Sequence, residues 1–210
     1  MTIGIIGSGN VGGTLGTRWA QAGHQVIFGS RNPQATDIQN LLAKTGATAR
    51  AASQQEAAHS AEVLLIATPW PATRAAIQGL GDLAGKVVID ATNPLAAGLS
   101  GLEIGTTTSA GEQVASWARG AKVVKAFNTV GFNIMANPAF GTDRPVLFYC
   151  GDDGSAKNTV RSLIEPLGFE PIDAGPLRQA RLLEPFALLW ISLALQYGQG
   201  REIAFKLLRR

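Results

Sequence analysis

A glycine-rich turn near the start of the chain limits the possible folds more than any other feature. A short apolar run at residues 3–6 leads directly into the pattern G-x-G-x-x-G at residues 7–12, and a helical pattern then continues to Gly23. A second apolar run at residues 25–28 completes a strand–helix–strand unit. Because the glycines lie between a strand and a helix, they predict a turn that binds the pyrophosphate of a dinucleotide. The alternative is a glycine-rich turn without a ligand.

The three glycines of the pattern have different predicted tasks. Gly7 permits the tight turn out of the strand, Gly9 lets a pyrophosphate approach the backbone, and Gly12 lets the helix pack closely on the sheet. The free N–H groups at the start of the helix, together with the positive end of its dipole, would face the phosphates.

The end of the second strand indicates which dinucleotide binds. Sites that prefer NAD(H) usually carry Asp or Glu about twenty residues after the glycine turn, where it binds the ribose 2′-hydroxyl. This chain has Ser30 and Arg31 there and no acid among residues 29–33. A hydroxyl beside a guanidinium suits a 2′-phosphate, so the sequence predicts NADP(H). The alternative is that Ser30 caps the next helix and Arg31 is solvated.

Apolar runs and helical patterns alternate along the rest of the chain. This alternation predicts an α/β protein with a Rossmann-type, doubly wound and mostly parallel sheet. Further strands are expected at residues 47–50, 63–67, 87–90, 122–127, 146–150 and 169–173. Further helices are expected at residues 34–44, 53–59, 72–79, 109–117 and 155–167, and after Pro176. We expect residues 1–143 to form the dinucleotide-binding domain and residues 144–210 to add a small C-terminal βαβα extension, on the substrate or dimer side.

Residues that follow the central strands are expected at the ligand crevice, since ligands of such sheets bind at the carboxyl ends of the strands. Thr68, Pro69 and Trp70 follow the most apolar interior strand and should border the cofactor. Residues 91–95 follow the next strand and should lie at the same edge. The glycine-rich segment 96–105 has no periodicity and is expected to be a loop near the substrate.

Composition narrows the classes of partner. The net charge is +3 and no run of Lys and Arg occurs apart from Arg209 and Arg210, so the sequence favours anionic small molecules over nucleic acid. The single cysteine, Cys150, allows no intrachain disulfide, and with two histidines the chain has no Cys–His metal set. We therefore expect no metal site.

The apolar segments indicate where the protein resides and how it assembles. No basic region precedes Ile3, so we expect no signal peptide. The apolar stretch 185–195 is too short to cross a bilayer, so we expect a cytoplasmic protein without a membrane partner. The apolar residues between positions 182 and 195 exceed what a small extension needs to bury, which predicts a homodimer.

Motifs along the chain resemble the F420H2:NADP oxidoreductase family. They are GSGNVG at residues 7–12, GSR at 29–31, TPW at 68–70 and CGDD at 150–153. The most specific are DAGPL at 173–177, RL at 181–182 and FKL at 205–207. The segment VKAFNT at 124–129 resembles instead the reductase domain of the six-transmembrane metalloreductases. These belong to the same superfamily and pass hydride from NADPH to a flavin.

The resemblance implies hydride transfer between NADP(H) and a small redox co-substrate, either the deazaflavin F420 or a flavin. It implies that Ser8, Gly9, Asn10 and Val11, between Gly7 and Gly12, hold the pyrophosphate. It further implies that Ser30 and Arg31 hold the 2′-phosphate. The residues that would line the ribose and nicotinamide are Thr68, Pro69, Trp70, Asn93 and Pro94.

Two residues after the strand at 122–127 are candidates for contacts with the acceptor ring. Asn128 and Thr129 offer hydrogen bonds to it, and the alternative is that they fix the loop. Lys125 is expected to place its amine on a carbonyl or in solvent. No general acid is predicted, because hydride transfer between stacked rings depends mainly on positioning and on exclusion of water.

The chain departs from the family pattern at two places. Archaeal F420 enzymes tend to carry histidine at the position of Asn128, and no lysine follows Arg31 closely to help with the 2′-phosphate. The first departure keeps an NADPH-dependent flavin or ferric reductase that does not use F420 as an alternative. A β-hydroxyacid or imine reductase and a non-enzymatic NADP(H) sensor are further alternatives.

Overall fold

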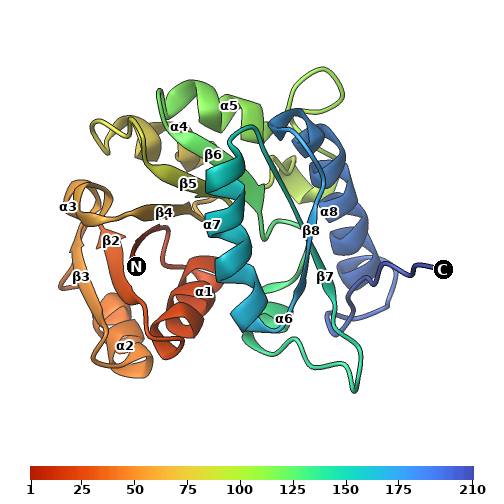
Figure 1. The fold of residues 1–210 in the computed structure, drawn as a ribbon, viewed down its shortest axis with the longest axis horizontal. Coiled ribbons are helices and arrows are strands. Elements are labelled where there is room, and N and C mark those ends of the chain that lie inside the picture. The colour runs from red at the N-terminus through yellow and green to blue at the C-terminus, as the bar shows by residue number, and fades with distance from the viewer.

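The computed structural model describes all residues, 1–210, and contains one sheet of eight strands in the order β3-β2-β1-β4-β5-β6-β7-β8 (Figure 1). The strands are β1 Thr2–Ile6, β2 Gln25–Ser30, β3 Ala49–Ser53, β4 Val63–Ile66, β5 Val87–Asp90, β6 Lys122–Ala126, β7 Val146–Gly151 and β8 Glu170–Asp173. Only β6 and β7 pair antiparallel. The predicted α/β, doubly wound and mostly parallel sheet is thereby confirmed.

Helices cover both faces of the sheet. They are α1 Asn10–Gln21, α2 Thr36–Thr45, α3 Gln54–Ser60, α4 Trp70–Gln78, α5 Ala110–Trp117, α6 Phe132–Ala136, α7 Gly154–Ile164 and α8 Ala180–Leu195. One apolar cluster joins β1 and β4 to α1, α6 and α7, and a second joins the other face to α3, α4, α5 and α8. The β4 sequence VLLI is wholly apolar because a central parallel strand is buried on both faces.

The predicted elements occur in the predicted order, with shifts at some ends. The edge strand expected at 47–50 is β3, Ala49–Ser53, and the helix expected at 72–79 already begins at Trp70. Pro71 fits inside the first turn of α4 because no intrahelical N–H bond is required there. The segment 96–105 is irregular apart from the short 3-10 helix Ala97–Leu99. The short helix α6 was not expected.

The C-terminal part of the chain continues the same sheet through the pairing of β7 with β6. Its order, β7, α7, β8 and α8, is the expected βαβα extension. Figure 1 shows α2 and β3 at one end of the sheet and α8 at the other. Residues before and after position 143 belong to the same apolar cluster. The division into two parts at residue 143 stays a prediction.

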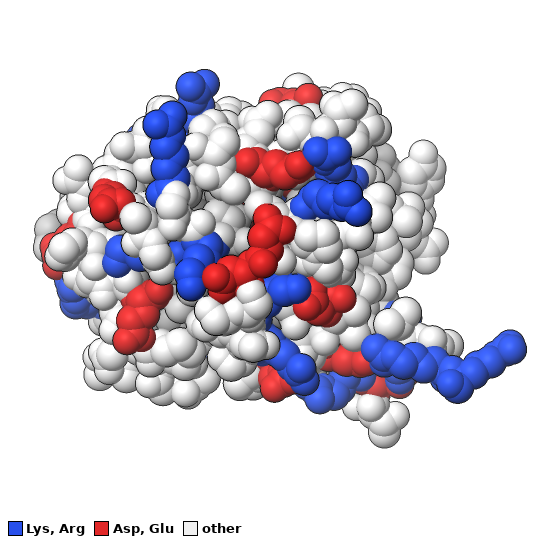
Figure 2. All heavy atoms as spheres, turned by 45° about the horizontal axis from the view of Figure 1, so that its top comes forward, with Lys and Arg blue, Asp and Glu red and all other residues white.

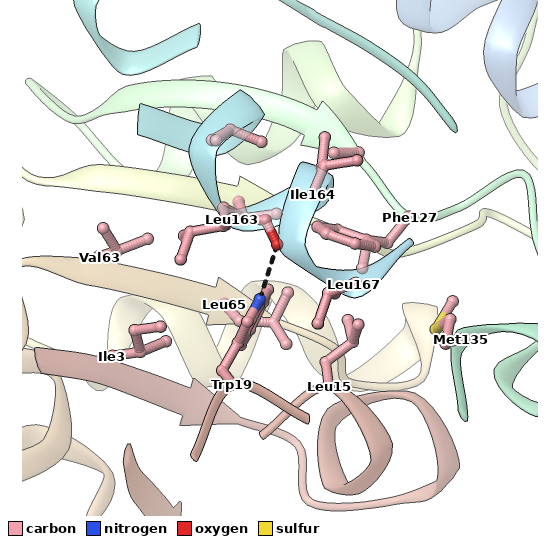
Figure 3. Close-up of a cluster of buried hydrophobic side chains, with 14 of the residues drawn as sticks. Ile3, Leu15, Trp19, Val63, Leu65, Phe127, Met135, Leu163, Ile164 and Leu167 are labelled. Atoms are coloured by element: carbon pink, nitrogen blue, oxygen red, sulfur yellow. Dashed lines mark hydrogen bonds between the residues drawn. The ribbon is translucent and has the colours of Figure 1, made fainter. Parts of the chain in front are cut away.

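Trp19 of α1 lies at the centre of this shared core. Its indole Nε1 donates a buried hydrogen bond to the carbonyl of Leu163 in α7, at 3.1 Å (Figure 3). The Trp19 ring also meets Phe127 edge to face, with 5.6 Å between the ring centroids. Phe127 follows β6, so Trp19 connects the glycine-turn helix both to the extension and to the segment after β6.

The surface charge and the helix lengths bear on which surroundings the protein can contact. On the face shown in Figure 2, basic and acidic side chains are interspersed, in keeping with the net charge of +3. None of the helices has both the length and the apolar composition that are needed to span a membrane.

Candidate functional site

The glycine turn between β1 and α1 has the geometry that its sequence predicts. Gly7 has a φ of +101°, a conformation that residues with a side chain rarely adopt. A Cβ on Gly12 would lie 1.9 Å from the carbonyl oxygen of Gly7, so only glycine lets α1 pack this closely. A Cβ on Gly9 would meet no atom within 4 Å. The fold therefore requires glycine at positions 7 and 12, while the space beside Gly9 is open.

The start of α1 is free to receive an anion. Gly9 is its N-cap, no side chain caps it, and its first turn contains no acidic residue. Asn10 and Gly9 are exposed, and Ser8 and Val11 are half-buried. The N–H groups of a first helical turn have no intrahelical partner, and the helix dipole adds partial positive charge there. The residues present thus fit a pyrophosphate.

A cleft of about 790 Å³ opens beside this turn. It brings together six of the residues predicted to bind the cofactor: Gly7, Ser8, Ser30, Arg31, Thr68 and Pro69. The other residues of its wall were not predicted; they are Gly29, Asn32, Ala35, Asp37, Ile38, Gln54, Ala72, Ala75 and Ala76. Most of these lie in or just before α2, α3 and α4. The rule that ligands bind where strands end would have found their region, although not the individual side chains.

Ser30 and Arg31 form the cleft wall at the end of β2. The hydroxyl of Ser30 accepts a hydrogen bond from the N–H of Asn32 at 3.1 Å. The next helix, α2, has Ala35 as its N-cap, so the alternative in which Ser30 caps this helix is wrong. Arg31 is exposed and takes part in none of the ion pairs of the structure, which leaves its guanidinium available to an anion.

Trp70 begins α4 at the crevice edge, but its side chain does not line the cleft. The indole stacks instead on Trp117 of α5, with 5.4 Å between the ring centroids and 28° between the planes. Its neighbours Thr68 and Pro69 do line the cleft. The sequence motif therefore located the segment correctly, whereas the orientation of the indole depends on a tertiary contact with another helix.

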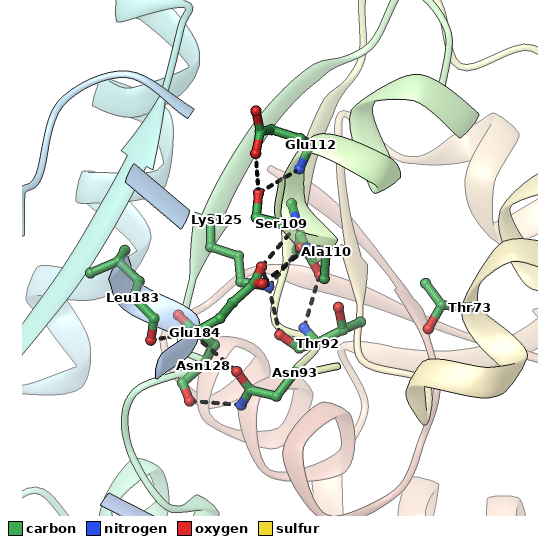
Figure 4. A network of polar contacts seen from close by, with 12 residues as sticks. Thr73, Thr92, Asn93, Ser109, Ala110, Glu112, Lys125, Asn128, Leu183 and Glu184 are labelled. Atoms are coloured by element: carbon green, nitrogen blue, oxygen red, sulfur yellow. Dashed lines mark hydrogen bonds and ion pairs between the residues drawn. The ribbon is translucent and has the colours of Figure 1, made fainter. Parts of the chain in front are cut away.

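The predicted residues after β5 and β6 form a second group, separate from the cleft. The side-chain amide of Asn93 donates to the carbonyl of Asn128 at 2.9 Å, and the amide of Asn128 donates to Oδ1 of Asn93 at 3.2 Å (Figure 4). The Asn128 amide also donates to the carbonyl of Leu183 in α8, at 3.1 Å. Pro94 is buried next to Asn93. Asn128 thus fixes the segment after β6 to two other segments.

Unused hydrogen-bonding capacity remains in this second group. Asn128 and Thr129 are 5% and 2% exposed. The atoms Oδ1 of Asn128, Oγ1 of Thr129 and Oγ1 of Thr92 are buried without a hydrogen-bond partner. Buried polar atoms in folded proteins are nearly always paired, so three orphans on two adjacent segments mark a place where a ligand or water completes the structure.

Lys125 of β6 is fully buried among charged partners. Its ammonium lies 2.9 Å from Asp90 Oδ2, 3.0 Å from Glu184 Oε1 and 2.6 Å from the carbonyl of Thr92 (Figure 4). Burial by itself lowers the pKa of the ammonium, but Asp90 and Glu184 outweigh it, so the pKa of Lys125 lies above its usual value. The expected carbonyl contact is confirmed and the solvated alternative is wrong. Both carboxylates were missed, although a lysine within a buried strand requires a counter-ion.

The segment after β6 also carries backbone strain. Phe127 has a φ of +67°, although it is not a glycine. Such a conformation is costly for a bulky residue and persists only where the surroundings enforce it. Phe127 stands between Lys125 and Asn128, so the strained position lies within the second group of predicted residues.

Two substitutions separate the structural from the binding role of the glycine turn. Gly12→Ala is expected to destabilise the protein by about 1–3 kcal/mol, because the added methyl must displace backbone atoms. Gly9→Ala is expected to leave the melting temperature unchanged and to weaken NADPH binding roughly tenfold, because the methyl would enter the open space in which the pyrophosphate is predicted to lie. Thermal unfolding and a fluorescence titration with NADPH measure the two effects. Unchanged NADPH affinity in Gly9→Ala would contradict the assignment of this turn.

The chain is similar to known reductases in sequence. A family model described as "NADP oxidoreductase coenzyme F420-dependent" matches residues 2–94. The chain is 30% identical to the F420-dependent NADP reductase of Methanothermobacter thermautotrophicus, over 92% of this chain and 89% of that protein. It is 35% identical to metalloreductase STEAP3 of Rattus norvegicus over 89% of this chain, but spans only 36% of that longer protein.

A solved structure is similar over its full length. It is a candidate F420-dependent NADP reductase from Arthrobacter sp. FB24, with a TM-score of 0.89 and 32% identity over 99% of both chains. Together with the glycine turn, the cleft beside Ser30 and Arg31, and the identity to the Methanothermobacter enzyme, this likeness shows that the chain belongs to the family of F420-dependent NADP reductases.

Proposed function

We propose that the protein is an NADPH-dependent oxidoreductase that transfers hydride between NADP(H) and a deazaflavin of the F420 type or a flavin. The observation that carries this proposal is the cleft that Gly7, Ser8 and the unpaired Arg31 line together. Ser8 leads directly into the open position at Gly9 and the uncapped start of α1. These features suit a ligand with a pyrophosphate and a third phosphate. The names of the related reductases support the same cofactor.

We propose that the residues of the cleft, the start of α1 and the segment after β5 each contact a different part of the cofactor. We assign the pyrophosphate to the turn at Ser8, Gly9, Asn10 and Val11, where backbone N–H groups donate. We assign the 2′-phosphate to Ser30 and Arg31. We assign the ribose and nicotinamide to Thr68, Pro69, Asn93 and Pro94. We propose that Trp70 borders the cofactor through its backbone at the start of α4, since its indole stacks on Trp117 and does not line the cleft.

When bound, the nicotinamide would supply or accept the hydride, and the residues of the chain would position it. Asn93 and Asn128 hold each other across the ends of β5 and β6, which gives the crevice a fixed wall at that end. The orphan atoms Oδ1 of Asn128 and Oγ1 of Thr129 offer an acceptor and a hydroxyl for polar edges of a ring. Positioning of this kind supplies a large share of the rate of hydride transfer and needs no general acid.

We also propose that the protein forms a homodimer through α8. Leu182 and Leu189 of this helix are 66% and 49% exposed, and they lie seven residues apart on one face. A small apolar cavity of about 270 Å³, which includes Phe148 and Phe186, opens beside Leu182. Exposed leucines next to an apolar cavity favour a protein partner.

Analytical ultracentrifugation tests the homodimer. The wild-type protein should have twice the mass of one chain, and Leu189→Glu, which places a charge on the exposed face of α8, should have the mass of one chain. A monomeric wild type contradicts the proposal.

The cytoplasmic location stays a prediction.

Replacement of Arg31 tests the choice of cofactor. Arg31→Ala is expected to weaken NADPH binding by about 10- to 100-fold, the effect of one lost charge-assisted bond to phosphate. NADH affinity should stay the same, because NADH has no 2′-phosphate. Titration of both nucleotides measures the change. Arg161→Ala removes an exposed arginine that pairs with Glu165 on α7, outside the cleft, and serves as the control. Equal losses for NADPH and NADH would contradict a 2′-phosphate contact at Arg31.

The identity of the acceptor is tested by NADPH oxidation with different rings. Purified protein is mixed with NADPH and with F420, FMN, FAD or riboflavin, and the loss of NADPH absorbance is recorded, with NADH as the control. Turnover with F420 assigns a deazaflavin acceptor, and turnover with flavins alone assigns a flavin or ferric reductase on the same scaffold. Tight NADPH binding without any turnover would overturn the enzyme proposal in favour of an NADP(H) sensor.

A further inference from the structure

We propose that Asp90, Lys125 and Glu184, here called the Lys125 network, position the segments that receive the nicotinamide half of the cofactor. Glu184 of α8 is the positioning residue. Through it the C-terminal extension holds the segments after β5 and β6 in place. The proposal rests on the proposed function, because it assumes that NADP(H) binds along the crevice.

The Lys125 network lies directly beneath both segments. Asp90 ends β5 and Lys125 lies near the end of β6, and the two residues are partners in the parallel strand register. Asn93 follows Asp90 by three residues, and Asn128 follows Lys125 by three residues. A shift of either charged side chain therefore moves the backbone that carries the Asn93–Asn128 pair.

The network holds the backbone of one residue, Thr92, through both of its peptide groups. Asp90 Oδ1 accepts the N–H of Thr92 at 2.9 Å, and the Lys125 ammonium donates to the carbonyl of Thr92 at 2.6 Å. Because Thr92 immediately precedes Asn93, its backbone orientation determines where the Asn93 side chain points. The ion network thereby holds the segment after β5 in one conformation.

Glu184 connects the same network to two helices. Its Oε2 and Oε1 accept the N–H groups of Ala110 and Gly111 at 2.9 and 3.0 Å, at the start of α5. Its neighbour Leu183 offers the carbonyl that binds the Asn128 amide. Consecutive residues of α8 thus hold the start of α5, the Lys125 ammonium and the segment after β6 (Figure 4).

The charge balance argues that the network does more than stabilise the fold. Two carboxylates and one ammonium, each at most 1% exposed, leave one surplus negative charge, which the start of α5 partly offsets. Apolar residues of similar size often stabilise a core as well as or better than buried ions, whereas ions fix one geometry. The strained Phe127 and the orphan atoms of Thr92, Asn128 and Thr129 lie on the segments so fixed, which is typical of a prepared binding region.

Binding of two ligands tests the proposal independently of the acceptor. One ligand is NADPH, and the other is 2′-phospho-ADP-ribose, which lacks the nicotinamide. Glu184→Gln keeps the size and one acceptor oxygen but removes the charge. It is expected to reduce the preference for NADPH over 2′-phospho-ADP-ribose about tenfold, and to leave the affinity for 2′-phospho-ADP-ribose unchanged. The turnover number with the active acceptor should fall as well.

The matched control breaks a different contact between the same two helices. Glu112 of α5 pairs with Arg181 of α8 at 2.6 Å but touches neither segment of the crevice. Glu112→Gln should leave the preference for NADPH unchanged. An equal loss in Glu112→Gln would show that helix docking in general is responsible and would overturn the proposal. A parallel loss of both ligands in Glu184→Gln would overturn it too.

A second variant covers the case in which Glu184→Gln does not fold. Asp90→Asn removes the other carboxylate and should produce the same selective loss of the nicotinamide contribution. If the preference for NADPH is unchanged in a folded Asp90→Asn, the network does not position the segments and the proposal fails. Failure of the proposed function has a different signature, because the wild-type protein then either binds neither ligand or binds NADPH without turnover on any acceptor.

Discussion

The burial of one ammonium between two carboxylates ties the parts of this protein together. Lys125 bonds to Asp90 at the end of the neighbouring strand and to Glu184 on the last helix. An unpaired charge in this position would be very costly, so the ammonium requires a carboxylate and each carboxylate requires the ammonium. The C-terminal extension is therefore more than an addition to the edge of the sheet. It supplies a counter-ion, Glu184, to a lysine near the end of a central strand.

Much of the fold was accessible from the sequence because its signals are local. The apolar run of β4, the glycine turn and the cap of α5 by Ser109 each depend on residues close in the chain. The hydroxyl of Ser109 accepts the N–H of Glu112, as the spacing of the two residues predicts. The ends of elements were less predictable. Trp70 begins α4 two residues before the expected start, because Pro71 is compatible with a first helical turn.

The candidate site was predictable where backbone geometry decides and unpredictable where tertiary contacts decide. Gly7 and Gly12 follow from the space that the turn leaves, so their motif was sufficient. The stacking of Trp70 on Trp117 and the contact of Asn128 with Leu183 join segments far apart in the chain. No local pattern encodes such contacts. The lysine in β6 and the glutamate in α8 were visible as charges within apolar runs, but their mutual partnership emerges only from the topology.

The two proposed ends of the crevice differ in how they are built. The proposed phosphate end consists of the glycine turn and the exposed Arg31, which lie within or directly after the first strand–helix–strand unit. The other end depends on residues of β5, β6 and α8 that hold one another in place, with Leu183 and Glu184 as the contributions of the extension. Changes in α8 can therefore reshape the acceptor end without disturbing the phosphate end. On the proposed function, we expect substitutions in α8 to alter the use of the second substrate more than the binding of the phosphates.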